Sequence, residues 1–151
     1  MNQVKATTLP AFSELHQRII EGDFIDCYGV PSAMPPRRAA EVITHFPSWA
    51  RGLLVIRRLI TAPFGLSNDG PQASDKLGPF PVESETNQEL VAGFNDKHLN
   101  FRVSVISHAG QVYLSTWVRP NHWSGRVYLA VIMPFHILIA RNALKRVAAA
   151  S

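Results

Sequence analysis

Polar residues near the middle of the chain have the types that acid–base chemistry uses. The stretch FNDKHLNFRV (94–103) sets Asp96, His98 and Arg102 among residues that otherwise alternate like a strand. Histidine has an ordinary pKa of about 6.5, so its ring can take or give a proton near neutral pH. Arg102, or Arg119 further along the chain, could hold a carboxylate or phosphate through two parallel hydrogen bonds.

The same residues also have a structural interpretation. Asn95 and Asp96 are residue types that favour turns by bonding to nearby backbone, so NDKH also reads as a four-residue turn in which Asp96 caps His98. Glu85 could orient His98 or pair with Arg102, or it could be an exposed loop acid. On the structural interpretation, the two arginines lie on a solvated strand face.

A second histidine, His136, lies in the apolar run VYLAVIMPFHILIA (127–140). There it is either an acid or base in a pocket or a hydrogen-bonded core residue. No two of the six histidines are three or four residues apart and Cys27 is the only cysteine, so the local spacing predicts neither a metal site nor a cofactor. Cys27 itself is expected to be a buried thiol.

Alternating apolar residues predict the strands that position these groups. They recur every second residue over 90–94, 99–105 and 112–118, which predicts an antiparallel meander with one apolar face. Matching those faces pairs Phe94 with Leu99 and Val105 with Val112, with loops at 95–98 and 108–109. The third strand then returns toward Asp96 and His98. These two residues would form one polar corner at this end of the sheet, together with Arg119, Asn121, His122 and Trp123.

Helices are predicted before and after the meander in the chain. Ser13 can cap a short helix near 13–21, a strand is expected over 23–30, and a helix should begin at Pro36. A second helix would carry the stripe of Trp49, Leu53, Ile56 and Ile60. A long C-terminal helix, kinked or split at Pro134, would turn Val127, Val131, Leu138 and Leu144 toward the sheet and fray from about 147.

Composition places the chain among ordinary globular domains. It has 151 residues, 46% hydrophobic and 17% charged, with a net charge of +4. We expect one domain over 1–151, in the cytoplasm, because no apolar signal segment opens the chain. The fourteen-residue apolar run is shorter than the roughly 20 residues of a membrane span, so no stable span is expected. The modest positive charge does not demand a nucleic-acid partner.

Three segments carry a resemblance to a known family: GPFPVESET (78–86), NDKHLNFRVSV (95–105) and GRVYLAVIMPFHILIARNALKR (125–146). They resemble an uncharacterised bacterial domain-of-unknown-function family whose members are also found behind short-chain-dehydrogenase-like domains. The order of elements resembles the α+β helix-grip architecture of START, Bet v 1 and polyketide-cyclase-like (SRPBCC) proteins. That resemblance implies a curved antiparallel sheet wrapped around the C-terminal helix.

The resemblance also implies an apolar pocket for lipids or ring compounds between sheet and helix; a filled core is the alternative. Its candidate ligand-binding residues are the following: Trp49, Glu85, Asp96, Phe101, Arg102, Leu114, Thr116, Arg119, Tyr128 and Phe135. Three functions stay open: a domain that binds a small apolar ligand, a cyclase, dehydratase or isomerase using His98 or His136, and a membrane-surface or protein-interaction module, with a homodimer as one form.

Overall fold

The alternating residues of the second half form the centre of an antiparallel sheet. The computed structural model describes residues 4–45, 76–77, 80–95 and 99–150. Three long strands lie side by side in it, each paired antiparallel with the next. They are β5 (Glu89–Asn95), β6 (Leu99–His108) and β7 (Gln111–Pro120).

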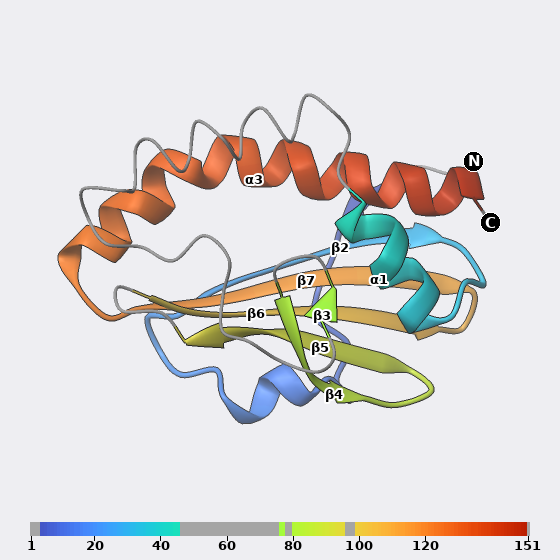
Figure 1. The fold of residues 1–151 in the computed structure, drawn as a ribbon, viewed down its shortest axis with the longest axis horizontal. Helices are drawn as coiled ribbons and strands as arrows, with labels where there is room; N and C mark the ends of the chain where they lie inside the picture. Colours follow the sequence, from blue (N-terminus) through green and yellow to red (C-terminus); the bar gives the residue numbers. More distant parts are fainter. Residues whose placement is uncertain (1–3, 46–75, 78–79, 96–98, 151) are drawn as a thin grey trace.

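Shorter strands extend this sheet at both edges, all of them antiparallel to their neighbours. They are β1 (Lys5–Ala6), β2 (Phe24–Pro31), β3 (Lys76–Leu77) and β4 (Phe80–Glu85). The order across the described sheet is β1-β2-β7-β6-β5-β4-β3 (Figure 1).

Helices cover the two faces of the sheet. The long α3 (Trp123–Ala150) crosses one face, and α1 (Pro36–Thr44) packs beside its carboxyl-terminal half (Figure 1). The short 3-10 helix η1 (Glu14–Gln17) lies against the other face, capped by the Ser13 side chain as predicted. The prediction of an α+β fold with an antiparallel sheet against a C-terminal helix is confirmed.

The predicted faces of the strands are right, but the predicted register is wrong by two residues. Phe94 lies opposite Phe101, not Leu99, and Val105 lies opposite Leu114, not Val112. A shift of two residues keeps every side chain on its face, so face matching alone cannot detect it. The turn geometry sets the register: the second hairpin turns at Ala109 and Gly110, both with positive φ, instead of at 108–109.

The core under α3 is concentrated at the carboxyl-terminal half of this helix. Ala140, Ala143, Leu144 and Val147 are all buried, and the small alanine side chains allow the helix to approach the sheet closely. The helix continues to Ala150, and Val147 and Ala148 are buried, so the described chain is still helical where fraying was expected.

The predicted inward face of α3 needs a correction. Leu144 faces the core, whereas Val127, Val131 and Leu138 are exposed to solvent. The half-buried residues from Trp123 to Ile139 are Ser124, Tyr128, Leu129, Ile132, Met133, His136 and Ile139. The buried residues of the carboxyl-terminal half fix the rotation of α3 about its own axis. Because the helix continues through Pro134 without a break, this rotation also decides which residues of the amino-terminal half face the sheet. The predicted second helix, with Trp49, lies outside the described residues.

Candidate functional site

A histidine and an aspartate meet between the sheet and α3. His136 Nε2 lies 2.8 Å from Asp26 Oδ2, and both side chains keep some solvent exposure, 24% and 16%. The second carboxylate oxygen of Asp26 accepts a hydrogen bond from the backbone N–H of Thr116 at 3.1 Å. The carboxylate is therefore held at both oxygens, one by β7 and one by α3.

Among the residues that the structure describes, Nδ1 of His136 has no hydrogen-bond partner. An ionised carboxylate only accepts hydrogen bonds, so Nε2 of His136 donates and Nδ1 of the neutral ring is an acceptor. A carboxylate that orients an imidazole in one tautomer is the arrangement used by many general bases. Phe24 meets the same ring edge-on, with 6.2 Å between the two centroids. The ring is thus fixed by one polar and one aromatic neighbour.

Apolar and aromatic residues share the helix-facing side of the sheet with the Asp26–His136 pair. Three of the predicted pocket residues, Phe101, Leu114 and Thr116, share this side, and Tyr128 is half-buried on α3. Phe101 makes edge contacts with Phe80 and Phe94, at centroid separations of 5.6 and 4.7 Å. Phe135, by contrast, is 40% exposed.

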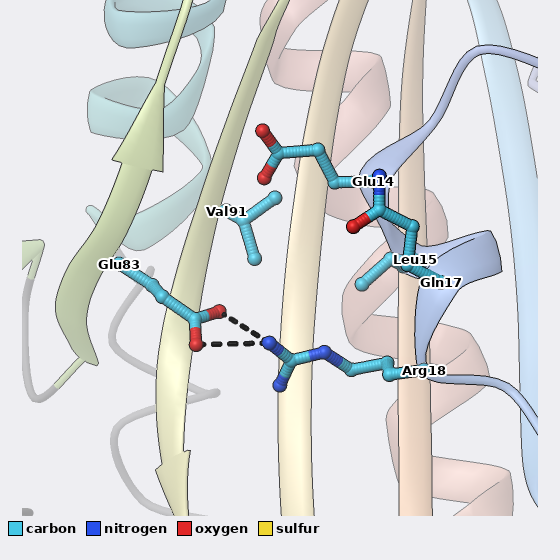
Figure 2. Close-up of a pocket in the computed structure, with 6 residues that line it drawn as sticks. All are labelled: Glu14, Leu15, Gln17, Arg18, Glu83 and Val91. Carbon is cyan, nitrogen blue, oxygen red and sulfur yellow. Dashed lines mark hydrogen bonds and ion pairs between the residues drawn. The ribbon is translucent and has the colours of Figure 1, made fainter.

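A separate polar network occupies the opposite face of the sheet, beneath η1. Figure 2 shows Arg18 reaching across to the carboxylate of Glu83, with donor–acceptor distances of 2.9 and 3.1 Å. A pocket of about 240 Å³ lies beside this ion pair, with Leu15 and Val91 among the residues that line it. Burial raises the pKa of Glu83, but hydrogen bonds from Arg18 and Arg102 more than offset this and hold it below its ordinary value.

The two predicted anion-binding arginines belong to this opposite face and already have carboxylate partners. Arg102 is 8% exposed and donates to Glu83 at 3.1 Å. Arg119 donates twice to Asp23, at 2.9 and 2.8 Å, and lies over the ring of Trp117. An external carboxylate or phosphate would have to displace these internal partners. Both arginines therefore join β6 and β7 to neighbouring segments.

Asp23 is the most strongly perturbed acid of the network. Hydrogen bonds from Arg119 lower its pKa from 3.8 to about 2, and bonds from the Ile20 backbone and Trp117 add to this effect against the opposing effect of burial. The carboxylate therefore remains charged throughout the neutral range.

Glu89 is a buried acid that fastens the N-terminal segment to the sheet. It is 4% exposed. It accepts hydrogen bonds from the Ser13 hydroxyl at 2.6 Å, the Glu14 backbone N–H at 2.9 Å and the Ser104 hydroxyl at 2.5 Å. Because all three donors are internal, this carboxylate positions η1 and is unavailable to a ligand.

Glu85 has a different partner from those predicted. It pairs with Arg37 of α1 at 2.5 Å, while the neighbouring acid Glu83 takes the place beside Arg102. A register shift between Val82 and Ser84 separates the two acids. An irregularity of this kind changes which side chains point to each face, so simple alternation cannot locate it.

The remaining predicted residues are placed as follows. His98 and Asp96, like Trp49, lie outside the described residues. Cys27 is buried, and burial together with the nearby Asp26 raises the pKa of its thiol to about 12, so it stays protonated at neutral pH. Within the described part of the chain, no group of three or more His, Cys, Asp or Glu residues is arranged to hold a metal ion.

Sequence reasoning missed the pairing of Asp26 with His136. Asp26 alternates with Phe24 and Tyr28, so it lies on the face that α3 covers, and His136 was already a candidate. An acid among apolar residues on that face was the available signal. Which residue of α3 reaches it depends on the rotation and crossing of the helix, which are properties of the packed molecule.

Comparisons with known proteins show membership of a family without an assigned activity. No curated protein and no solved structure matches the chain significantly. A family model described as "Protein of unknown function (DUF2867)" matches residues 20–143, which include the strands of the meander, Asp26 and His136. The chain therefore belongs to this family of proteins of unknown function.

Proposed function

We propose that this protein binds a small, largely apolar molecule between the amino-terminal half of α3 and the sheet. The observation that carries the proposal is the Asp26–His136 pair, partly exposed among aromatic and aliphatic side chains. Binding sites for small molecules are mostly apolar and contain a few placed polar groups. Nδ1 of His136 would accept a hydrogen bond from a hydroxyl or similar donor on the ligand.

The burial pattern along α3 also supports this location. The inward residues of the carboxyl-terminal half of the helix are buried, whereas those of the amino-terminal half are only half-buried. Phe24, Phe101 and Thr116 on the sheet are likewise only half-buried. Apolar surface incompletely covered on two facing elements is suited to a ligand of matching chemistry.

The first test is extraction of the folded, purified protein followed by mass spectrometry of bound compounds. Thr116→Phe would place a large ring beside the Asp26–His136 pair and should reduce the amount of retained apolar compound. Val131→Phe is the matched control, because Val131 is 56% exposed on the outer side of α3. Equal retention by the two folded variants, or no bound compound in the parent protein, would contradict the proposal.

The polar anchor has its own test once a ligand is found. Asp26→Asn should weaken binding of a hydroxyl-bearing ligand by about tenfold or more, since a charge-assisted hydrogen bond that orients His136 is lost. An analogue of the ligand without the hydroxyl should bind the parent and Asp26→Asn proteins equally. Circular dichroism of both proteins would establish that the fold is unchanged.

A second candidate function is acid–base catalysis of the isomerase, cyclase or dehydratase kind. The 2.8 Å contact of Asp26 with His136 favours it, because it leaves Nδ1 able to remove a proton and return it to another atom of the substrate. Exchange of solvent deuterium into carbonyl compounds, followed by NMR, would detect such a base. His136→Ala should abolish the exchange; unchanged exchange in this variant, with loss only in His98→Ala, would assign the base to His98 instead.

A further inference from the structure

The outer face of α3 presents apolar side chains to solvent over its amino-terminal two-thirds. Trp123 is 73% exposed and Leu138 is 55% exposed. The exposed large apolar residues of this helix are Trp123, Val127, Val131, Phe135, Ile137 and Leu138. Most follow at intervals of three or four residues, which aligns them along one side of a helix. We call these six residues the outer stripe of α3.

No charged residue interrupts the outer stripe between Val127 and Leu138. The chain carries none between Arg126 and Arg141. By length and composition α3 could cross a membrane, a test that core helices of soluble proteins also meet. Large contiguous apolar patches on folded proteins mark surfaces that bind another protein or a membrane.

The charged residues of α3 itself are all of one sign. The helix contains Arg126, Arg141, Lys145 and Arg146 and no acidic residue, and the last acid of the chain is Asp96. Arg126 and Lys145 are exposed, one near each end of the helix. Arg146, by contrast, donates to backbone carbonyls of α1 and His45. An apolar strip with basic ends and a terminal tryptophan is typical of helices that lie at an anionic lipid surface.

We propose that the outer stripe of α3 docks on the surface of a bilayer that contains anionic lipid. The helix would lie in the plane of the interface, with the apolar side chains among the outer acyl segments and Arg126 and Lys145 near lipid phosphates. It does not span the bilayer in this arrangement, because Ala143, Leu144 and Val147 remain in the protein core and His136 remains paired with Asp26.

Charge favours a lipid surface over a second copy of the chain. In an antiparallel pair of α3 helices centred on the outer stripe, Arg126 of each helix would lie beside the apolar residues near Phe135 of its neighbour, and α3 has no acidic residue to pair with it. A charge placed against apolar surface without an opposite charge opposes association. Anionic headgroups instead complement both the basic ends and the apolar strip.

The test is flotation of the full chain with vesicles of phosphatidylcholine, alone or mixed with phosphatidylserine. We expect partitioning onto the mixed vesicles, weakened by added salt. The double variant Val131→Glu/Leu138→Glu should lose at least about tenfold in partitioning, since two charges replace inserted apolar groups. Ile20→Glu is the matched control, because Ile20 is 59% exposed on the η1 side of the molecule, and it should partition like the parent.

Three outcomes would overturn the proposal. The parent protein could fail to partition onto the mixed vesicles at low salt, or the folded double variant could partition as well as the parent. A parent dimer in sedimentation equilibrium that the double variant converts to a monomer would assign the outer stripe to a second copy. A double variant that unfolds at a much lower temperature than Ile20→Glu without vesicles would show that the chain itself covers this face.

Discussion

At the scale of single residues, carboxylates with several internal donors hold the N-terminal segment against the sheet. Asp23 accepts hydrogen bonds from Arg119, Trp117 and the Ile20 backbone, and Glu89 accepts from Ser13, Ser104 and the Glu14 backbone. These donors come from segments far apart in the chain, so each carboxylate links elements that the hydrophobic face alone would leave unattached.

The pKa of Asp23 predicts how stability depends on pH. Because the pKa is about 2 in the folded protein and 3.8 without its partners, the stabilisation it contributes is complete above about pH 4 and is lost as the pH falls toward 2. Urea unfolding of the parent and Asp23→Asn proteins should give a difference in unfolding free energy that is constant near neutral pH and shrinks over this acid window. A difference that grows in acid would contradict the assignment.

Gly93 lies where the neighbouring strand leaves no room for a side chain. It has a φ of +140°, and a Cβ added there would lie 2.4 Å from the carbonyl oxygen of Phe101 and 3.2 Å from Cδ of Arg102. Gly93→Ala should therefore reduce the free energy of unfolding by about 1–3 kcal/mol, measured by chemical denaturation.

Gly22→Ala is the control for the Gly93 prediction. Its φ is also positive, at +92°, but no heavy atom lies within 4 Å of an added Cβ. Gly22→Ala should therefore lower the free energy of unfolding by less than Gly93→Ala does, since only its backbone conformation is strained. Equal losses in the two variants would show that contact with Phe101 and Arg102 contributes nothing.

At the scale of elements, turn chemistry decides what strand periodicity leaves open. Ala109 and Gly110 both have positive φ, 52° and 77°, which is the two-residue turn geometry that matches the twist of an antiparallel hairpin. Alanine is strained at a positive φ, whereas asparagine tolerates it. Hydrophobic alternation in β6 and β7 allowed either of two turns that differ by one residue, and the conformation of Gly110 favours the observed one.

The strained turn predicts a stabilising substitution. Ala109→Asn should raise the free energy of unfolding by about 1 kcal/mol, because Asn-Gly is the preferred pair for this turn. Thermal denaturation of the parent and variant would measure it. Unchanged or lower stability would mean that the backbone of Ala109 is not held at a positive φ in solution.

At the scale of the whole molecule, α3 has two different halves. The carboxyl-terminal half is part of the main core together with α1, β2 and β5 to β7. The amino-terminal half combines the inward Asp26–His136 pair with the outer stripe. Both proposals thus concern the half of the helix that contributes least to the core, so functional variants there should leave the fold intact.

Two matched leucine variants test this division. Leu144→Ala removes a fully buried side chain and should cost about 2–5 kcal/mol of unfolding free energy. Leu138→Ala removes an exposed one and should change stability by less than about 0.5 kcal/mol. Chemical denaturation of both proteins is the measurement, and similar losses would mean that Leu138 is buried in solution.

Much of the fold could be predicted from the sequence because strand alternation is a local property. The apolar faces of β5, β6 and β7, the cap at Ser13 and the helix from Pro36 all follow from residues a few positions apart. The exchange of Glu85 for Glu83 beside Arg102 could not be predicted, because the irregularity in β4 arises from its pairing with β5. Alternation in β6 and β7, by contrast, already places Arg102 and Arg119 on the opposite face from Phe101 and Thr116, and the structure agrees.

The sequence by itself determined which residues share a face, because side-chain direction in a strand depends only on whether a position is odd or even. It also determined that the last helix is apolar on nearly all sides. The tertiary structure decided that His136 meets Asp26, that the arginines already have carboxylate partners, and that the outer stripe faces solvent. Those outcomes depend on the rotation of α3 and on contacts between residues 19 to 110 positions apart, which no local pattern encodes.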